Sequence, residues 1–170
     1  IMKKYFLLLP LLGFISMSSF SQKYAFIDTK YILSQMPEYT DAQKEIDDLA
    51  EKWQKDIEKK YNEIESKYKA FQEEEILLPE ETKKIRMDEI IDLEKKAKEL
   101  QKKRFGVQGD LFKKRKELID PIQDEIYKAV KQLSKDNNYS FILDKSKNSN
   151  IIYADPKYDK SDAVLRKINN

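Results

Sequence analysis

Apolar residues recur three or four positions apart from Tyr39 to Phe71, which is the pattern of one face of a long helix. The segment between Glu38 and Leu78 contains no glycine or proline that would interrupt such a helix. The stripe consists of Tyr39, Ala42, Ile46, Leu49, Trp53, Ile57, Tyr61, Ile64, Tyr68 and Phe71.

A second stripe with the same spacing follows the segment 76–80, where Pro79 suits the first turn of a new helix. It includes Ile90, Leu93, Ala97, Leu100, Val107, Leu111, Leu118, Ile122, Ile126, Ala129 and Leu133. We therefore predict a coiled-coil-like helical hairpin over residues 39–138, with its turn near 76–80 and arms about 55 Å long. Gly106, Gly109 and Pro121 are the hinge candidates, with a bend expected near Asp120-Pro121.

Short apolar runs flank the hairpin and have the pattern of strands near 24–28, 139–144 and 151–154. A short helix is predicted before Pro37, and a terminal helix over 161–168. Residues 22–38 and 139–170 would thus form the two parts of one body. The predicted fold class is α+β, mostly α, with the hairpin protruding from that body.

Residues 1–21 have the organisation of a secretory signal peptide. Lys3-Lys4 precedes the apolar run from Tyr5 to Ile15, and Ser19 and Ser21 suit cleavage before Gln22. The alternative, a membrane anchor, needs roughly 20 apolar residues, whereas eleven span only about 16 Å as a helix. We therefore predict an exported protein.

Composition narrows the range of possible functions. The 170 residues are 38% charged and contain no Cys and no His, so the commonest general base, metal ligands and a thiol nucleophile are missing. We expect no enzyme, no cofactor and no metal site. Removal of residues 1–21 would take away Lys3 and Lys4 and no acid, which leaves 31 basic and 31 acidic residues. This neutral balance and the export argue against nucleic-acid binding.

The predicted elements are incomplete in a single chain. Three short strands form a marginal sheet with open edges, and a two-helix arm has no third layer over its apolar side. Both deficiencies disappear if several copies join their strands in one body and project their arms together. We therefore predict an obligate homo-oligomer.

The residues in the two body segments are similar to those of a known family. The matching runs are Tyr24-Ala25-Phe26-Ile27-Asp28, Tyr31-Ile32-Leu33, Tyr139-Ser140-Phe141-Ile142-Leu143-Asp144, Ile151-Ile152-Tyr153-Ala154 and residues 161–169. With the signal peptide and the charged hairpin, the chain resembles the Skp/OmpH family of periplasmic chaperones for outer-membrane proteins. The resemblance implies a homotrimer with a small β-barrel body shared between subunits. It also implies an ATP-independent holdase for unfolded outer-membrane proteins in the periplasm of a Gram-negative bacterium.

One feature departs from that family. Its members are often basic with positive arm tips, whereas here the tip contains Glu73-Glu74-Glu75 and Glu80-Glu81. The acidic tip argues against contact with lipopolysaccharide or an anionic membrane.

A holdase needs apolar contacts spread over a large, adaptable surface. The candidates for client contact are Trp53, Tyr61, Tyr68, Phe71, Ile76, Leu77 and Leu78; the alternative is that they form the seam and turn of the hairpin. The candidates for the oligomeric body are Phe26, Ile27, Phe141, Leu143, Ile151 and Tyr153.

Two further alternatives remain open. The basic band of residues 102–104 and 113–116 is either a solvated face paired to the acidic first arm or a site for acidic clients or lipid. A structural coiled-coil scaffold of the cell envelope would explain the hairpin equally well. It would not explain the end strands or the short terminal helix.

Overall fold

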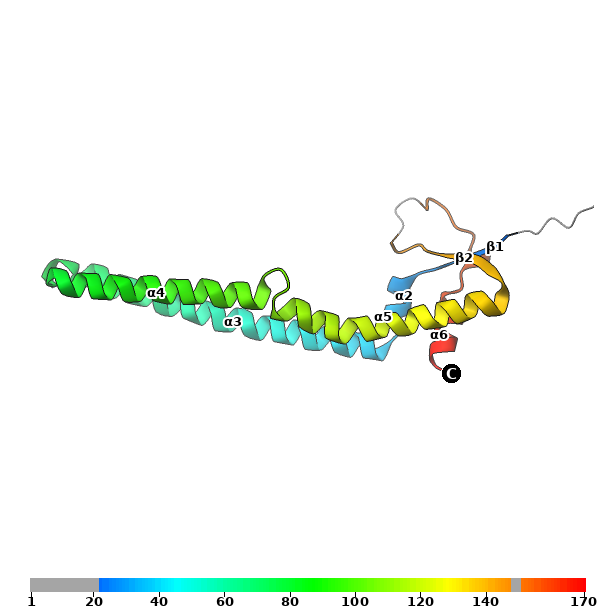
Figure 1. The fold of residues 1–170 in the computed structure, drawn as a ribbon, viewed down its shortest axis with the longest axis horizontal. Coiled ribbons are helices and arrows are strands. Elements are labelled where there is room, and N and C mark those ends of the chain that lie inside the picture. The colour runs from blue at the N-terminus through cyan, green and yellow to red at the C-terminus, as the bar shows by residue number, and fades with distance from the viewer. Residues whose placement is uncertain (1–21, 148–150) are drawn as a thin grey trace, which may run out of the picture.

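The computed structural model describes residues 22–147 and 151–170; the predicted signal peptide lies outside the described residues. A long helical hairpin projects from a small body (Figure 1). Helix α3 (Pro37–Glu74) forms the outgoing arm, and the 3-10 turn η2 (Glu75–Leu77) reverses the chain. Helices α4 (Glu80–Phe105) and α5 (Asp110–Asn137) form the returning arm. The two arms thus span residues 37–137, and the chain reverses between α3 and α4.

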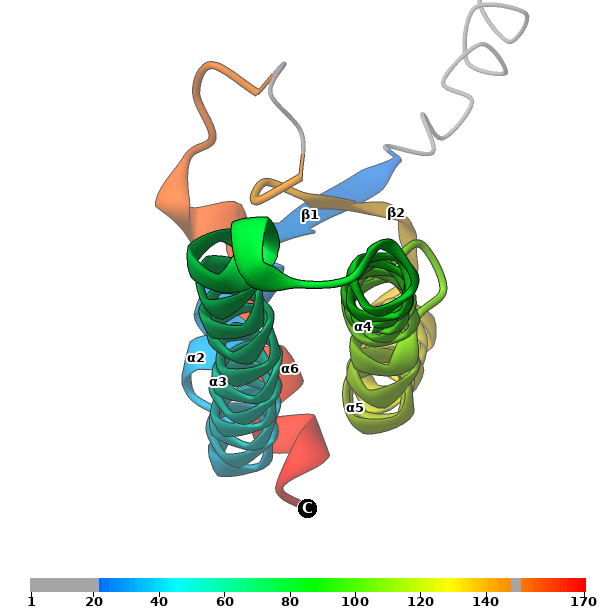
Figure 2. The same cartoon turned by 90° about the vertical axis from the view of Figure 1, so that its left-hand side faces the viewer.

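The body combines the two ends of the chain. Strand β1 (Lys23–Ile27) pairs in parallel with β2 (Tyr139–Asp144), so that Tyr24 lies opposite Phe141 and Phe26 opposite Leu143. Parallel strands need a long crossover connection, and here the whole hairpin supplies it. Helix α2 (Thr29–Ser34), the 3-10 turn η3 (Pro156–Tyr158) and helix α6 (Ser161–Ile168) complete the body. Figure 2, which looks along the arms, shows the two-stranded sheet lying across both of them.

Apolar side chains form two separate buried clusters. The body cluster joins β1, α2 and α6 to the roots of both arms, with Ile32, Ile46 and Val164 fully buried. The arm cluster lies nearer the tip and consists of Ile64, Phe71, Ile90 and Ala97, with Tyr61, Leu78, Met87 and Leu93 packed against it. Because each fully buried aliphatic or aromatic side chain contributes about 1.5–3 kcal/mol, each cluster stabilises its own part of the hairpin.

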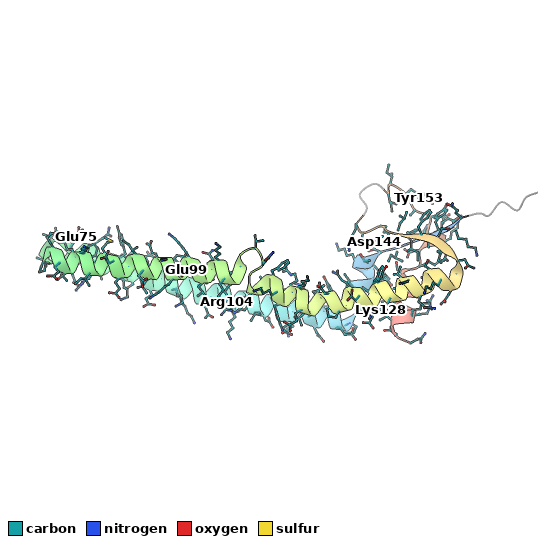
Figure 3. The ribbon with its side chains drawn as sticks, viewed as in Figure 1. Glu75, Glu99, Arg104, Lys128, Asp144 and Tyr153 are labelled. Atoms are coloured by element: carbon teal, nitrogen blue, oxygen red, sulfur yellow. The ribbon has the colours of Figure 1, made fainter. Side chains whose placement is uncertain are left out.

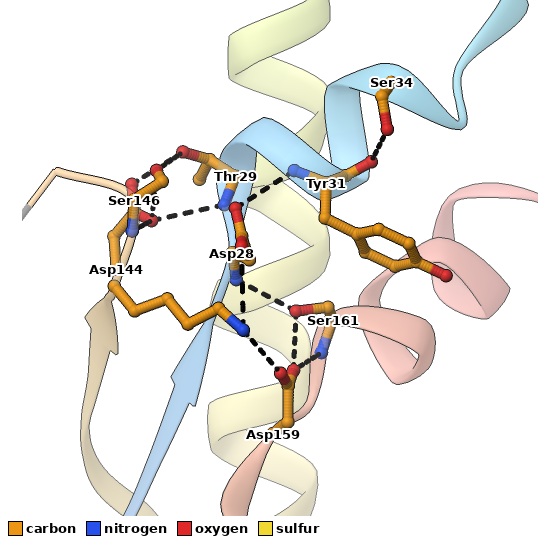
Figure 4. Close-up of polar contacts among 9 residues, drawn as sticks. Asp28, Thr29, Tyr31, Ser34, Asp144, Ser146, Asp159 and Ser161 are labelled. Atoms are coloured by element: carbon orange, nitrogen blue, oxygen red, sulfur yellow. Dashed lines mark hydrogen bonds and ion pairs between the residues drawn. The ribbon is translucent and has the colours of Figure 1, made fainter. Parts of the chain in front are cut away.

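A polar junction ties the first body segment to the last (Figure 4). The Asp28 carboxylate caps α2 by accepting from the Tyr31 N–H at 3.0 Å, and the Asp28 N–H donates to Ser161 Oγ at 2.9 Å. The Thr29 hydroxyl donates to Asp144 Oδ2 at 2.6 Å. Residues more than a hundred positions apart are thereby joined beside the end of the sheet.

The same hydrogen bonds set the charge state of two body carboxyls. Burial raises the pKa of Asp144, but hydrogen bonds from Thr29 and Ser146 lower it by more, so the pKa lies below its ordinary value. For Asp159, burial again raises the pKa, and hydrogen bonds from Ser161 together with nearby Lys145 outweigh it. Both carboxylates therefore favour the folded state when they are ionised.

Two sequence-based predictions are wrong. Residues 151–154 form no strand, and the sheet of the described residues has two strands rather than three. Ile152 and Tyr153 extend into solvent because the described part of this chain offers them no strand to pair with. The interruption of the returning arm lies at Gly106–Gly109, whereas α5 runs without a break through Pro121. The missing N–H of proline is tolerated there because Pro121 lies on the exposed side of the helix.

Candidate functional site

Three of the predicted client-contact residues lie inside the hairpin. Phe71 is buried in the arm cluster, and Tyr61 and Leu78 pack against that cluster from either side. The Tyr61 hydroxyl also donates to Gln101 Oε1 on the returning arm at 3.3 Å. These side chains hold the two arms together, as the seam alternative expected.

Trp53 also lies in the seam, at the level of the break between α4 and α5. The Phe105 ring meets the indole edge to face, with ring centroids 6.4 Å apart. The Arg104 guanidinium lies 4.4 Å from the centroid of the same indole. The Trp53 indole therefore contacts two side chains of its own chain, Phe105 and Arg104.

The other three predicted residues are open to solvent. Ile76 and Leu77 at the turn are 93% and 84% exposed, whereas the adjacent Leu78 packs inward. Leu78 is thus the residue that staples the turn. Tyr68, which shares the helical stripe with Phe71, is nearly half exposed because it lies at the edge of the seam. Figure 3 shows Glu75, the neighbour of Ile76, at the free end of the hairpin.

Several exposed apolar side chains on the returning arm were missed from the sequence. They are Ile85 and Ile91 on α4, Val107 in the break, and Phe112 and Tyr127 on α5. None of them was assigned to the client surface, although a usable signal existed: all but Val107 lie outside the apolar stripe of their helix. Large apolar residues outside a helical stripe have no seam to enter, so they face solvent or a partner.

A groove of about 400 Å³ lies where the returning arm meets the body. Ile27 and Leu33 line it from the body, and Ile126, Tyr127 and Val130 line it from α5. Gln123, Thr29 and Lys147 add polar atoms around this apolar floor. With Asp124 beside them, the groove presents a mixed apolar and polar surface.

The outer face of the sheet is also apolar. Tyr24 stacks on Phe141 with ring centroids 6.1 Å apart, and Tyr158 covers the other side of Tyr24 at 4.9 Å. Tyr24, Phe141 and Leu143 are each more than two fifths exposed. Of the other predicted body residues, Phe26 and Ile27 are buried within this chain, Ile151 is half-buried and Tyr153 is exposed.

Comparison with known proteins identifies the family. Residues 23–168 match the family of OmpH-like outer membrane proteins. The chain belongs to that family. An uncharacterized protein of Aquifex aeolicus (strain VF5) is 30% identical to it over 168 residues, which cover 99% of this chain and 97% of the relative.

A solved structure has the same fold as this OmpH-like chain. It is the crystal structure of a candidate outer membrane chaperone (OmpH-like) from Caulobacter crescentus CB15, with a TM-score of 0.70 at 10% sequence identity. The match covers 88% of this chain and 85% of the Caulobacter chain. Within residues 22–147 and 151–170, no helix of this family member is long and apolar enough to cross a membrane.

The basic band of this family member is partly paired. Lys114 reaches Glu45 of the outgoing arm at 3.0 Å, and Arg104 reaches Asp110 at 2.7 Å. Further ion pairs join the arms near the tip, Lys67 with Glu89 at 2.9 Å and Arg86 with Glu74 at 2.6 Å. Exposed pairs contribute little each, but their positions show which residues of the two arms lie at the same level.

Proposed function

We propose that this chain is an ATP-independent holdase chaperone that binds unfolded outer-membrane β-barrel proteins in the periplasm and prevents their aggregation. The observation that carries the proposal is the set of large apolar side chains that a strongly charged hairpin leaves exposed, above all Ile76, Leu77, Ile91 and Tyr68. Membership of the OmpH-like family supports it, as does the shared fold with a Caulobacter protein described as a candidate outer membrane chaperone.

The proposed mechanism uses many weak contacts. Each exposed apolar side chain contributes at most about 1.5–3 kcal/mol when a client covers it, so a single contact breaks readily. Several such contacts along the arm together hold an unfolded chain, while the intervening charges keep the complex in solution. Release then proceeds contact by contact as the client folds elsewhere, and no nucleotide is needed.

We further propose that the working form is a homotrimer whose bodies share one small β-barrel. Among the described strands β2 pairs only with β1, so its outer edge is open, and an open edge readily accepts another strand. The apolar face of Tyr24, Phe141 and Leu143 and the exposed Ile152-Tyr153 would be covered in such an assembly. The proposed export signal, residues 1–21, would place this trimer in the periplasm.

An aggregation assay tests the function. A urea-unfolded outer-membrane β-barrel protein is diluted into buffer with and without the chaperone, and turbidity is followed. We expect suppression by the wild type and weaker suppression by the double variant Ile76→Ser with Leu77→Ser. The control, Lys52→Ser with Lys59→Ser, changes two exposed residues without removing apolar surface. A wild-type protein that leaves the turbidity unchanged would refute the proposal and favour the envelope scaffold.

A further inference from the structure

We infer that a client lies along one particular face of the hairpin, the tyrosine face, which carries Tyr61, Tyr68, Ile91, Phe112 and Tyr127. This inference rests on the proposed holdase function and adds which surface binds and what chemistry it accepts. It follows from the helical phase of these residues and from the contacts between the arms.

On α3 the two flanks of the seam differ in charge. A helix advances about 100° per residue, and the buried Ile46, Ile57 and Ile64 fix the direction that faces the returning arm. Tyr61 and Tyr68 lie on one flank of that direction. Gln43, Gln54 and Gln72 share this flank, and all seven lysines of α3 lie on the other flank or at the back.

On the returning arm the corresponding flank is mixed, because Glu94, Lys98 and Lys102 lie beside the exposed Ile91. In antiparallel helices, residues displaced in the same rotational sense from the seam lie on the same face of the hairpin. The buried residues Ile90 and Ala97 of α4, and Ile122 and Ile126 of α5, define the seam there. Relative to it, Ile91, Phe112 and Tyr127 lie on the flank of Tyr68, whereas Ile85 lies on the opposite flank.

Contacts between the arms agree with this assignment. The Tyr61–Gln101 hydrogen bond of 3.3 Å lies on the tyrosine face. The ion pairs Lys67–Glu89 and Glu45–Lys114, at 2.9 and 3.0 Å, lie on the other face. Because Lys67 and Glu89 are at the same level, their near neighbours Tyr68 and Ile91 lie within about one helical turn of each other along the hairpin.

The face continues into the groove at the body. Tyr127, which belongs to the tyrosine face, also lines that groove, together with Val130 and Leu33. The face and the groove therefore lie next to each other on one side of the returning arm. A bound chain could therefore run from the body along the arm toward the tip without crossing the row of ion pairs.

The chemistry of the face indicates an extended polypeptide with apolar and uncharged polar side chains. The hydroxyls of Tyr68 and Tyr127 and the glutamine amides offer hydrogen bonds to the free backbone of an unfolded chain, whereas the Tyr61 hydroxyl already donates to Gln101. The α3 flank adds the carboxylates of Asp47, Glu58 and Glu65, and the α4 flank adds Glu94, Lys98 and Lys102, so both signs of charge occur along the face. From Gln43 to Tyr68 the face is about 38 Å long, the span of about 11 extended residues.

Ile85 and Ile91 provide a matched pair for the test. Both are isoleucines of α4 and their side chains are 61% and 55% exposed, but they lie on opposite faces. The photo-crosslinking residue p-benzoylphenylalanine is placed at either position, or at Tyr68, in the full chain. A urea-unfolded outer-membrane β-barrel protein is then diluted into each variant and irradiated. We expect at least fivefold more adduct from positions 91 and 68 than from position 85.

Binding measurements separate this inference from the proposed function. Ile91→Ser should raise the Kd for the same unfolded probe about fivefold or more, and Ile85→Ser should leave it within twofold. Circular dichroism checks that both variants keep their helices. Equal adduct yields or equal losses of affinity, with aggregation still suppressed, would overturn the face while leaving the holdase intact. Absence of both adducts and suppression would overturn the holdase itself.

Discussion

Arg104 lies across the ring of Trp53, with its guanidinium carbon 4.4 Å from the indole centroid, at the level where the returning arm is broken. The same guanidinium pairs with Asp110 at 2.7 Å, so one side chain bridges the end of α4 and the start of α5. A cation suits the C-terminal end of α4 and an anion the N-terminal end of α5. We infer that these contacts hold the two halves of the returning arm in line.

Arg104→Gln should loosen this joint. It removes the stacked cation and the ion pair, which together contribute about 1–2 kcal/mol when partly buried. Trp53 is the single tryptophan of the sequence, so its fluorescence reports the joint directly. We expect red-shifted emission and faster acrylamide quenching. Lys113→Gln removes the same charge from an exposed position nearby and should change neither; an equal change in both variants would contradict the assignment.

Gly106→Ala should destabilise the same region for a steric reason. A Cβ at this position would lie 2.3 Å from the carbonyl oxygen of Lys102, which is backbone that cannot rotate away. Overpacking of this kind costs about 1–3 kcal/mol. Urea unfolding followed at Trp53 measures the loss. An unchanged midpoint would show that the backbone at the break relaxes freely.

The long helices could be predicted from the sequence because a stripe of ten apolar positions at helical spacing is a local signal. The position of the break was predicted only in part: Gly106 and Gly109 were among the hinge candidates, but the bend was expected at Pro121. Proline is the stronger helix breaker in isolation, yet Pro121 fits an exposed side of α5. The spacing of Gly106 and Gly109 matters only because both lie against backbone carbonyls. The strand at 151–154 failed for another reason, since pairing depends on a neighbour that one described chain does not provide.

Acid should unfold the body through its hydrogen-bonded carboxylates. The pKa of Asp144 and that of Asp159 are lowered in the folded state, so the unfolded state binds more protons between those values and the ordinary pKa near 3.9. The resulting stability is present above that ordinary pKa and is lost as the pH falls through the lowered values. We expect a Tm that is level from pH 7 to about 5 and falls below about pH 4.

Asp144→Asn tests the source of that acid sensitivity. It weakens the charge-assisted hydrogen bonds from Thr29 and Ser146, which contribute about 1.5–3 kcal/mol when the acceptor is charged. The variant should be less stable than the wild type at pH 7 and should lose less stability on acidification. Thermal melts at pH 7 and pH 3 measure both. A parallel decline in the two proteins would assign the acid sensitivity to other groups.

Substitutions near the tip should separate client binding from the stability of the fold. Phe71→Ala empties a buried site in the arm cluster and should cost about 3–5 kcal/mol. Ile76→Ser with Leu77→Ser changes side chains that are already exposed and should alter the unfolding free energy by less than about 0.5 kcal/mol. Chemical denaturation measures both. A large loss of stability in the double variant would mean that the turn needs those residues.

The site was harder to predict than the fold. A stripe at helical spacing does not distinguish Phe71, which is buried, from Tyr68, which lies three residues away at the edge of the seam. Nor does it distinguish Leu77 from Leu78 in a turn, because one residue of shift reverses the direction of a side chain. Ile91, which is 55% exposed, was missed because the candidates were taken from the apolar stripe and the turn, and Ile91 lies beside the stripe.

The mass of the protein in solution tests the central claim most directly. Light scattering is measured for residues 22–170, alone and after a urea-unfolded outer-membrane β-barrel protein has been diluted into the solution. We predict a trimer that gains the mass of one client and remains soluble. A trimer whose mass is unchanged while the client precipitates would contradict the chaperone, and a monomer would contradict the shared body.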